Sequence, residues 1–141
     1  MAYLLHARLF LLTTFMLVLN LCTYPVMSHI PGGIEKSSME DEGARESLNF
    51  AVSQYNENNS DLYLSRVLEV KNVQKQVVGG TKFFFDVILV KTNCLKTQAD
   101  LTNCSAKDQA GQQEHEFCSF EVYDAPWEND MALISSSCHN I

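Results

Sequence analysis

The chain has 141 residues, of which 46% are hydrophobic and 19% are charged, and its formal net charge is −7. This composition is that of an ordinary globular protein, and the length suits one domain rather than two. The acidic balance, with no basic patch along the sequence, argues against nucleic acid as a partner.

The N-terminal segment has the features of a signal peptide. The run from Leu9 to Cys22 is uncharged and mostly apolar, and Arg8 precedes it. Fourteen residues are short for a membrane span and typical of the apolar core of a signal peptide. The alternative is an anchor that stays attached to the mature protein.

Cleavage after Ser28 suits the compact residues near that position, and cleavage after Thr23 is the other candidate. We therefore assign residues 1–28 to the signal peptide and residues 29–141 to a single domain. The mature protein is expected to be secreted and extracellular, with no membrane as a partner.

Five cysteines become four once the signal peptide is removed, because Cys22 leaves with it. An even number of cysteines in a short exported chain predicts two disulfides. Three pairings are possible, and we favour the sequential one, which closes two local loops: Cys94–Cys104 and Cys118–Cys138. Zinc is the competing interpretation, but there is no C-x-x-C motif and gaps of 10, 14 and 20 do not suit a metal site. We expect no metal.

Residues 37–60 predict one long helix. Ser38 followed by Asp41 fits a capping box, and the first turn is acidic. Five apolar residues recur at helical spacing and form one stripe, which needs a sheet to cover it. They are Ala44, Leu48, Ala51, Val52 and Tyr55.

Strands dominate the rest of the chain. Residues 62–78 predict a long strand whose alternation breaks, which indicates a bulge or strong bend. Residues 82–91 are apolar on both faces and predict a central strand, reached through the turn Gly79-Gly80. The remaining elements are a polar surface loop, a strand, a hairpin loop and a final strand: 95–114, 117–123, 125–130 and 131–138.

Two sequons for N-glycosylation are present. We expect the one at Asn58 to be used. The one at Asn103 has a cysteine as its middle residue, which makes a poor acceptor.

Three segments suit a binding surface. Val77-Val78 would be apolar surface at a hairpin tip, unless both side chains fold back on the core. Trp127 beside Pro126 is an anchor of the type enriched in hot spots, although tryptophan is more often half-buried. Gly32-Gly33 follows a proline and predicts a flexible arm.

Taken in order, these motifs resemble the secreted type 2 cystatins, which inhibit papain-like cysteine proteases. The resemblance runs from Gly32 to Cys138 and rests on the arm glycines, Gln76-x-Val78-x-Gly80, Pro126-Trp127 and the cysteine gaps. It implies an α+β, cystatin-like fold. In such a fold an antiparallel sheet of four to five strands wraps around one long helix, with two disulfides near the C-terminus.

The resemblance also implies a reversible, competitive and non-covalent inhibitor, which is not an enzyme and needs no cofactor. Its partners would be papain-like, cathepsin-type proteases. The alternative is a secreted cystatin-fold binding or signalling protein that has lost inhibition. The implied protease-binding residues are Gly32, Gly33, Gln76, Val77, Val78, Gly79, Gly80, Pro126 and Trp127.

Some features depart from the family pattern. Pro31 stands where many inhibitory cystatins carry a bulky aliphatic residue. Some type 2 cystatins also inhibit legumain through an asparagine followed by aspartate, but here Ser60 precedes Asp61, so we do not extend that activity to this chain. We expect a monomer. Strain at Val78 would favour a domain-swapped dimer without inhibition.

Overall fold

The computed structural model describes residues 2–22, 32–106 and 114–141. The chain divides into two units, residues 1–30 and residues 31–141, and each is described by itself. The expected cleavage sites and the first arm residues, up to Pro31, lie outside the described residues, as does part of the loop expected at 95–114.

In the first unit, helix α1 spans Ala2–Cys22, and its side chains are exposed from Ala2 to Asn20. This helix is longer than the uncharged run that suggested it. Judged by length and composition, the stretch Ala2–Asn20 could cross a membrane, and a signal sequence at the start of a chain passes the same test. Length therefore does not separate a signal peptide from an anchor.

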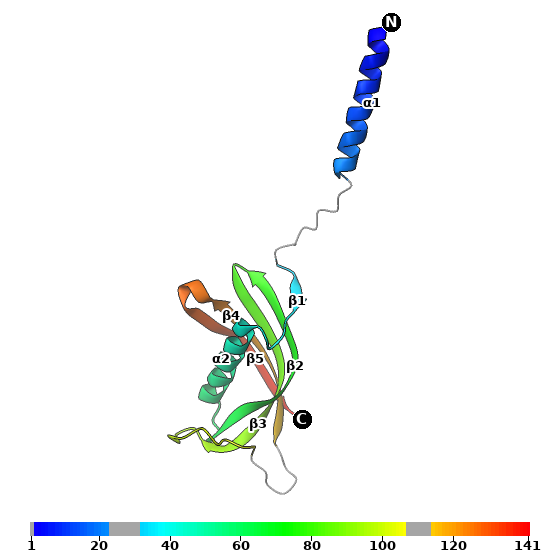
Figure 1. Cartoon of the computed structure of the whole chain (residues 1–141). Coiled ribbons are helices and arrows are strands. Elements are labelled where there is room, and N and C mark those ends of the chain that lie inside the picture. Colours follow the sequence, from blue (N-terminus) through cyan, green and yellow to red (C-terminus); the bar gives the residue numbers. More distant parts are fainter. Residues whose placement is uncertain (1, 23–31, 107–113) are drawn as a thin grey trace. The chain divides into compact units, whose positions relative to one another are not determined.

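The second unit contains one helix and one antiparallel sheet, which confirms the predicted fold class (Figure 1). The strand order in the sheet follows the chain, β1-β2-β3-β4-β5, and the sheet curves around the helix. The elements are β1 (Ile34–Lys36), α2 (Glu42–Asn58), β2 (Tyr63–Val78), β3 (Gly80–Leu95), β4 (His115–Ala125), the short 3₁₀ turn η1 (Pro126–Glu128) and β5 (Asp130–Asn140).

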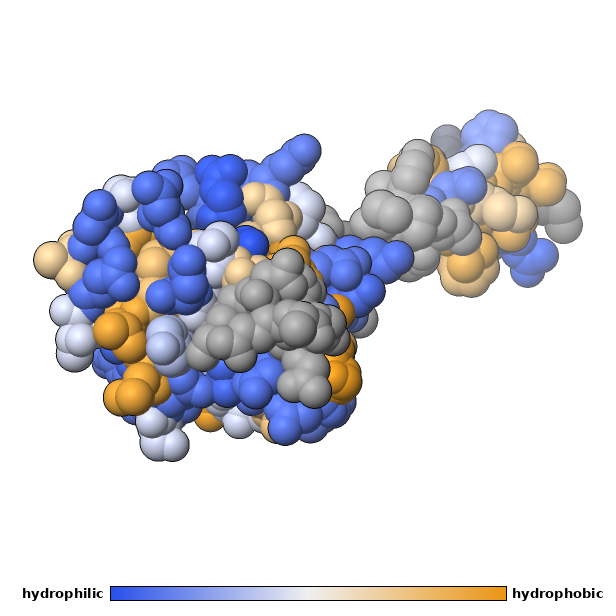
Figure 2. Space-filling view, turned by 90° about the horizontal axis from the view of Figure 1, so that it is seen from below, coloured by the Kyte–Doolittle hydropathy of each residue, from blue (hydrophilic) through white to orange (hydrophobic). Residues whose placement is uncertain are grey.

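Two lysines make ion pairs and hydrogen bonds at the end of the domain that lies away from the hairpin tips. Lys91 Nζ lies 2.6 Å from carboxylate oxygens of both Asp61 and Glu114, and Lys96 Nζ donates to Asn59 Oδ1 at 2.6 Å. Hydrogen bonding from Lys91 is the main reason that the pKa of Asp61 is lowered. Figure 2 looks onto this end and shows hydrophilic side chains over much of it.

Helix α2 begins later than predicted. Its N-cap is Asp41, whose side chain accepts a hydrogen bond from the Gly43 N–H at 3.0 Å. The capping box predicted at Ser38 was wrong, because the Ser38 hydroxyl accepts from the Glu40 N–H at 3.3 Å within a preceding turn. The acidic stretch thus supplies the cap and the first residue of the helix, where negative charge is favourable.

The predicted break in the strand at 62–78 is confirmed as bulges in β2. The register with β3 slips after Tyr63, after Val67 and after Val70. β3 is the middle strand of five, as its apolar residues on both faces predicted. The bulges let β2 bend, so the sheet can follow the helix.

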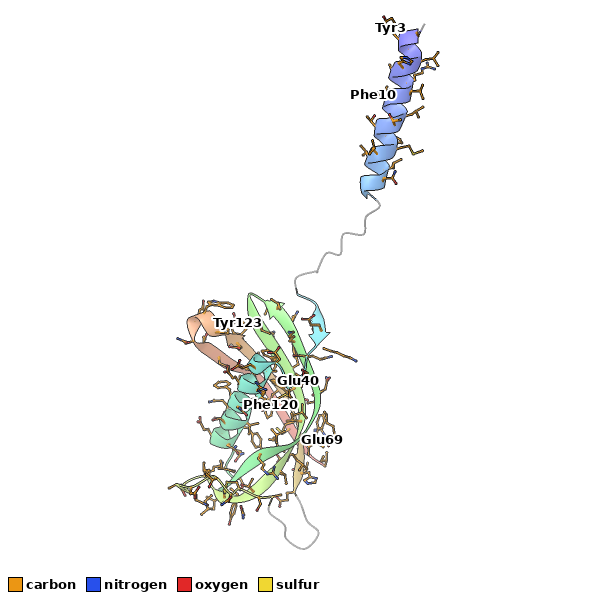
Figure 3. The ribbon with its side chains drawn as sticks, in the orientation of Figure 1. Tyr3, Phe10, Glu40, Glu69, Phe120 and Tyr123 are labelled. Carbon is orange, nitrogen blue, oxygen red and sulfur yellow. A yellow bond between two sulfur atoms is a disulfide. The ribbon has the colours of Figure 1, made fainter. Side chains whose placement is uncertain are left out.

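The core lies between α2 and the inner face of the sheet. Figure 3 labels Phe120 on β4 beside the helix, where its ring meets the ring of Tyr55 edge-on at 6.3 Å. The predicted apolar stripe of α2 is confirmed, with Ala44, Leu48 and Ala51 almost wholly buried. The buried cluster consists of Ala44, Leu48, Ala51, Val73, Phe83, Phe85, Val87, Leu89, Cys118, Phe120 and Val122.

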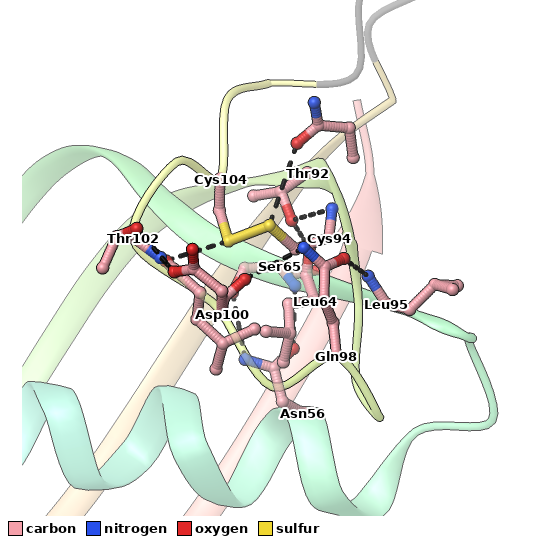
Figure 4. The surroundings of a disulfide bond; sticks show 12 residues. Asn56, Leu64, Ser65, Thr92, Cys94, Leu95, Gln98, Asp100, Thr102 and Cys104 are labelled. Atoms are coloured by element: carbon pink, nitrogen blue, oxygen red, sulfur yellow. Dashed lines mark hydrogen bonds between the residues drawn. A yellow bond between two sulfur atoms is a disulfide. The ribbon is translucent and has the colours of Figure 1, made fainter.

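Two disulfides confirm the sequential pairing. Cys94 is bonded to Cys104 across the loop after β3, as Figure 4 shows, with a Cα–Cα distance of 5.4 Å. Cys118 is bonded to Cys138, its partner in the register of β4 and β5. All four thiols are therefore occupied, and the zinc interpretation of these cysteines was wrong.

Candidate functional site

The first hairpin presents two valines to solvent. Val78 pairs with Gly80 across the single residue Gly79, whose φ of 95° lies in the left-handed region that glycine tolerates. Val77 and Val78 are 55% and 43% exposed, so they do not fold back on the core. The tip is an apolar surface as well as a turn.

Gly80 has a different role from Gly79. It is buried, and a Cβ at this position would lie 2.5 Å from the carbonyl oxygen of Asp124 and 2.8 Å from the ring of Tyr123. The next residue, Thr81, pairs with Asp124 in the sheet. Figure 3 labels Tyr123 at this end of the domain. The base of the first hairpin therefore lies directly against the strand that leads into the second.

The second hairpin presents an aromatic side chain. Pro126 starts the 3₁₀ turn η1, and the Asn129 N–H donates to the Pro126 carbonyl at 3.2 Å, with Asn129 at φ 48°. Trp127 in this turn is 66% exposed, so it is not the half-buried residue that tryptophan usually is. A short turn fixed by proline holds an exposed ring on a rigid support.

The arm joins the edge of the sheet beside the first hairpin. In β1, Ile34 pairs with Gln76, and the Gln76 side-chain amide donates a hydrogen bond to the Gly32 carbonyl. Gly32 has a φ of 107°, and Gly33 after it is exposed. Ile34 is 57% exposed, and we did not predict it as a surface residue. Its position directly after the arm glycines could have indicated that it is exposed.

All nine predicted residues thus lie at one end of the domain, in the arm and the two hairpins (Figure 1). We call this set, together with Ile34, the binding edge. It projects rather than forming a hollow. Two shallow grooves, of about 360 and 230 Å³, lie on the sheet away from it, and neither is lined by a residue of the binding edge.

Charged residues surround the binding edge. Lys82 and Glu121 form an ion pair of 2.8 Å across β3 and β4, and Lys75 lies 3.4 Å from Asp41. Asp124 is only 6% exposed, and burial, followed by the charge of Glu46, raises the pKa of its carboxyl group. This carboxyl lies directly behind the two hairpins.

Val78 does not have a positive φ. Among the described residues other than glycine, Asn129 alone has a positive φ. The strain that we considered at Val78 therefore does not take the form of a positive φ. Gly79, next to it, has the positive φ that this turn requires.

Comparison with known proteins identifies the family. A model described as Cystatin domain matches residues 32–127. Cystatin-S of Rattus norvegicus is 74% identical over 141 residues, which is 100% of both chains. Cystatin-C of Homo sapiens is 44% identical over 109 residues, 77% of this chain and 75% of that protein.

Solved structures agree. A crystal structure of dimeric human cystatin F has a TM-score of 0.71 at 23% identity, and the match covers 85% of this chain and 97% of that chain. A salivary cystatin from the soft tick Ornithodoros moubata has a TM-score of 0.62 at 27% identity and covers 78% and 99%. The chain therefore belongs to the cystatin family, as a type 2 member of this family of cysteine protease inhibitors.

Proposed function

We propose that the protein is a secreted, reversible, competitive and non-covalent inhibitor of papain-like cysteine proteases, of the cathepsin type. The binding edge would enter the protease cleft and cover the catalytic cysteine without placing a cleavable bond there. The observation that carries this proposal is the exposure of Val77, Val78 and Trp127 on two hairpins fixed side by side.

The physical case rests on preorganisation. The hairpin tips are held by sheet pairing and by a proline-containing turn, so they lose little conformational entropy when they bind. Exposed aromatic and aliphatic side chains at the centre of such a surface are typical hot spots. A compact apolar edge can therefore bind tightly.

Secretion is part of the proposal. It is supported by the N-terminal apolar helix and by the two disulfides, which form in oxidising compartments. We propose that residues 1–28 are removed and that the mature protein starts at residue 29. Sequencing the N-terminus of the protein from culture medium would test both points.

We propose a monomer, and we do not extend legumain inhibition to this chain. Asn59 accepts two hydrogen bonds from Lys96, at 3.0 and 2.6 Å, and Asp61 is held 2.6 Å from Lys91, so this loop is tied to the domain. Asn58, at the exposed end of α2, remains the predicted glycan site. Dimerisation is stated for human cystatin F, which is 23% identical to this chain.

Binding to papain whose catalytic cysteine has been alkylated tests the non-covalent mechanism. We expect the protein to bind this inert papain and to be recovered intact after incubation with active papain. Trp127→Ala should weaken binding roughly 30-fold, as truncation of a hot spot does. Ile134→Ala is the matched control, because Ile134 is 52% exposed on β5 outside the binding edge. Failure of the wild type to bind would favour a cystatin-fold protein without inhibition.

A further inference from the structure

Gln76 contacts the arm at two points. Its backbone pairs with Ile34 in the sheet, and its side-chain amide donates to the carbonyl of Gly32, two residues earlier. Gly32 is the first described residue of the arm, so this hydrogen bond is the outermost described contact between the arm and the domain.

Few other contacts hold this part of the arm. β1 has three residues, and all of them are exposed. Glu35 lies 4.0 Å from Lys75, and the Ser37 N–H donates to the Val73 carbonyl at 3.0 Å. Short edge strands with exposed hydrogen bonds open easily. One additional hydrogen bond at the end of such a strand therefore changes how often it opens.

The conformation of Gly32 makes this contact specific. Its φ of 107° is open to glycine and strained for other residues, although a Cβ here would meet no atom within 4 Å. Glycine suits this position because it tolerates the positive φ with which the Gly32 carbonyl faces the Gln76 amide.

We propose that Gln76 is a positioning residue that fixes the arm at Gly32 and so holds Gly32 and the start of β1 in the orientation that they present to the protease. This inference rests on the proposed inhibitory function. It assigns Gln76 a role within the inhibitor, acting through the arm. The role predicted from the sequence was direct contact with the protease, and the two roles can be separated.

Two substitutions remove the donor and keep the size of the side chain. Gln76→Glu replaces the amide with a carboxylate that cannot donate to the Gly32 carbonyl. Gln76→Met removes the amide without adding charge, which controls for electrostatic effects. Gln74→Glu is the matched control, because Gln74 lies two residues earlier on the same face of β2, opposite Lys36.

The first measurement concerns the free protein and does not depend on inhibition. The mature chain, purified from the medium of cells that express the full sequence, is examined by amide hydrogen exchange at residues 34–36. Loss of one hydrogen bond should speed exchange roughly fivefold in both Gln76 variants. Gln74→Glu should leave it unchanged. Unchanged exchange in the Gln76 variants would overturn the inference.

The second measurement is a double-mutant cycle with the arm. Papain inhibition is compared for wild type, Gln76→Met, a variant that lacks residues 29–32, and the combination of both. We expect Gln76→Met to weaken inhibition roughly fivefold in the complete chain and to have no effect once the arm is deleted. The same loss with and without the arm would mean that Gln76 contacts the protease directly, which would overturn the positioning role.

The two measurements separate this inference from the proposed function. If the wild type does not inhibit papain, the proposed function fails, while hydrogen exchange still decides whether Gln76 holds the arm. If the wild type inhibits and exchange at residues 34–36 is insensitive to Gln76, the proposed function stands and the positioning role is wrong.

Discussion

Gly80 lies so close to Asp124 that a Cβ at residue 80 would be 2.5 Å from the Asp124 carbonyl oxygen. The first hairpin therefore approaches the strand leading to the second so closely that a side chain at residue 80 would meet both the Asp124 backbone and the Tyr123 ring. The two hairpins of the binding edge are consequently packed against each other at their base.

Gly80→Ala should disrupt this contact, since backbone and the Tyr123 ring cannot both move aside. We expect a loss of roughly 2 kcal/mol in the free energy of unfolding, typical of overpacking, together with weaker inhibition. Gly79→Ala is the comparison: a Cβ there meets open space, but a φ of 95° costs it about 1 kcal/mol. Urea unfolding of both variants measures the difference. Equal stability of Gly80→Ala and wild type would contradict the contact.

Asp124 predicts a pH dependence of stability. Burial and Glu46 raise the pKa of its carboxyl group in the folded state. The folded state therefore binds the Asp124 proton more tightly than the unfolded state does. The stability that this proton contributes is complete below the unfolded pKa of about 3.9, and it is lost as the pH rises through the folded pKa. Asp124→Asn should therefore raise Tm by a few degrees at neutral pH and have little effect in acid. Asp130→Asn, at an exposed carboxyl, is the control. A stabilisation by Asp124→Asn that is equal at both pH values would contradict this assignment.

Tyr55 is expected to ionise only at high pH. Burial first, and then its hydrogen bond to Glu116, raise the pKa of Tyr55 to about 12. Ultraviolet titration of the folded protein should show a late phase that Tyr55→Phe removes. The same variant should lose about 1 to 2 kcal/mol of stability, because Glu116 loses its partner. Glu116→Gln keeps an acceptor and should be milder. A titration in which Tyr55→Phe removes no late phase would contradict the raised pKa of Tyr55.

The two disulfides should contribute unequally. Replacing both cysteines of a pair by serine typically costs about 2 to 5 kcal/mol in a small secreted domain. The Cys118–Cys138 pair should cost more than Cys94–Cys104, because its loop spans 20 rather than 10 residues. Loop length alone accounts for about 0.6 kcal/mol of the difference. Guanidinium unfolding under non-reducing conditions measures both, and the reverse order would contradict this ranking.

Local patterns in the sequence predicted most of the fold. The break in alternation along residues 62–78 predicted the bulges of β2, because side-chain parity along a strand is a local property. The apolar stripe from Ala44 to Tyr55 predicted the buried face of α2, because helical periodicity is also a local property of the sequence. Long-range contacts could not be predicted in this way.

Asn56 and β1 illustrate that limit. Asn56 is a polar residue near the end of the predicted helix, yet it is buried, and its side chain exchanges two hydrogen bonds with the backbone of Ser65, at 3.0 and 2.8 Å. β1 has only three residues, too few for a periodic pattern, and it exists through pairing with β2 far along the chain. At the site, the sequence predicted a glycine turn, but the close approach of Gly80 to Asp124 depends on a strand pairing.

Titration of papain and of a cathepsin L-type protease with the mature protein tests the central claim most directly. The double variant Val78→Asp with Trp127→Ala and the control Ile134→Asp are measured beside the wild type. We predict competitive inhibition at nanomolar concentration by the wild type and the control, and a loss of roughly a hundredfold or more in the double variant. A folded monomer that leaves both proteases active at micromolar concentration, or a double variant as potent as the wild type, would contradict the role of the binding edge.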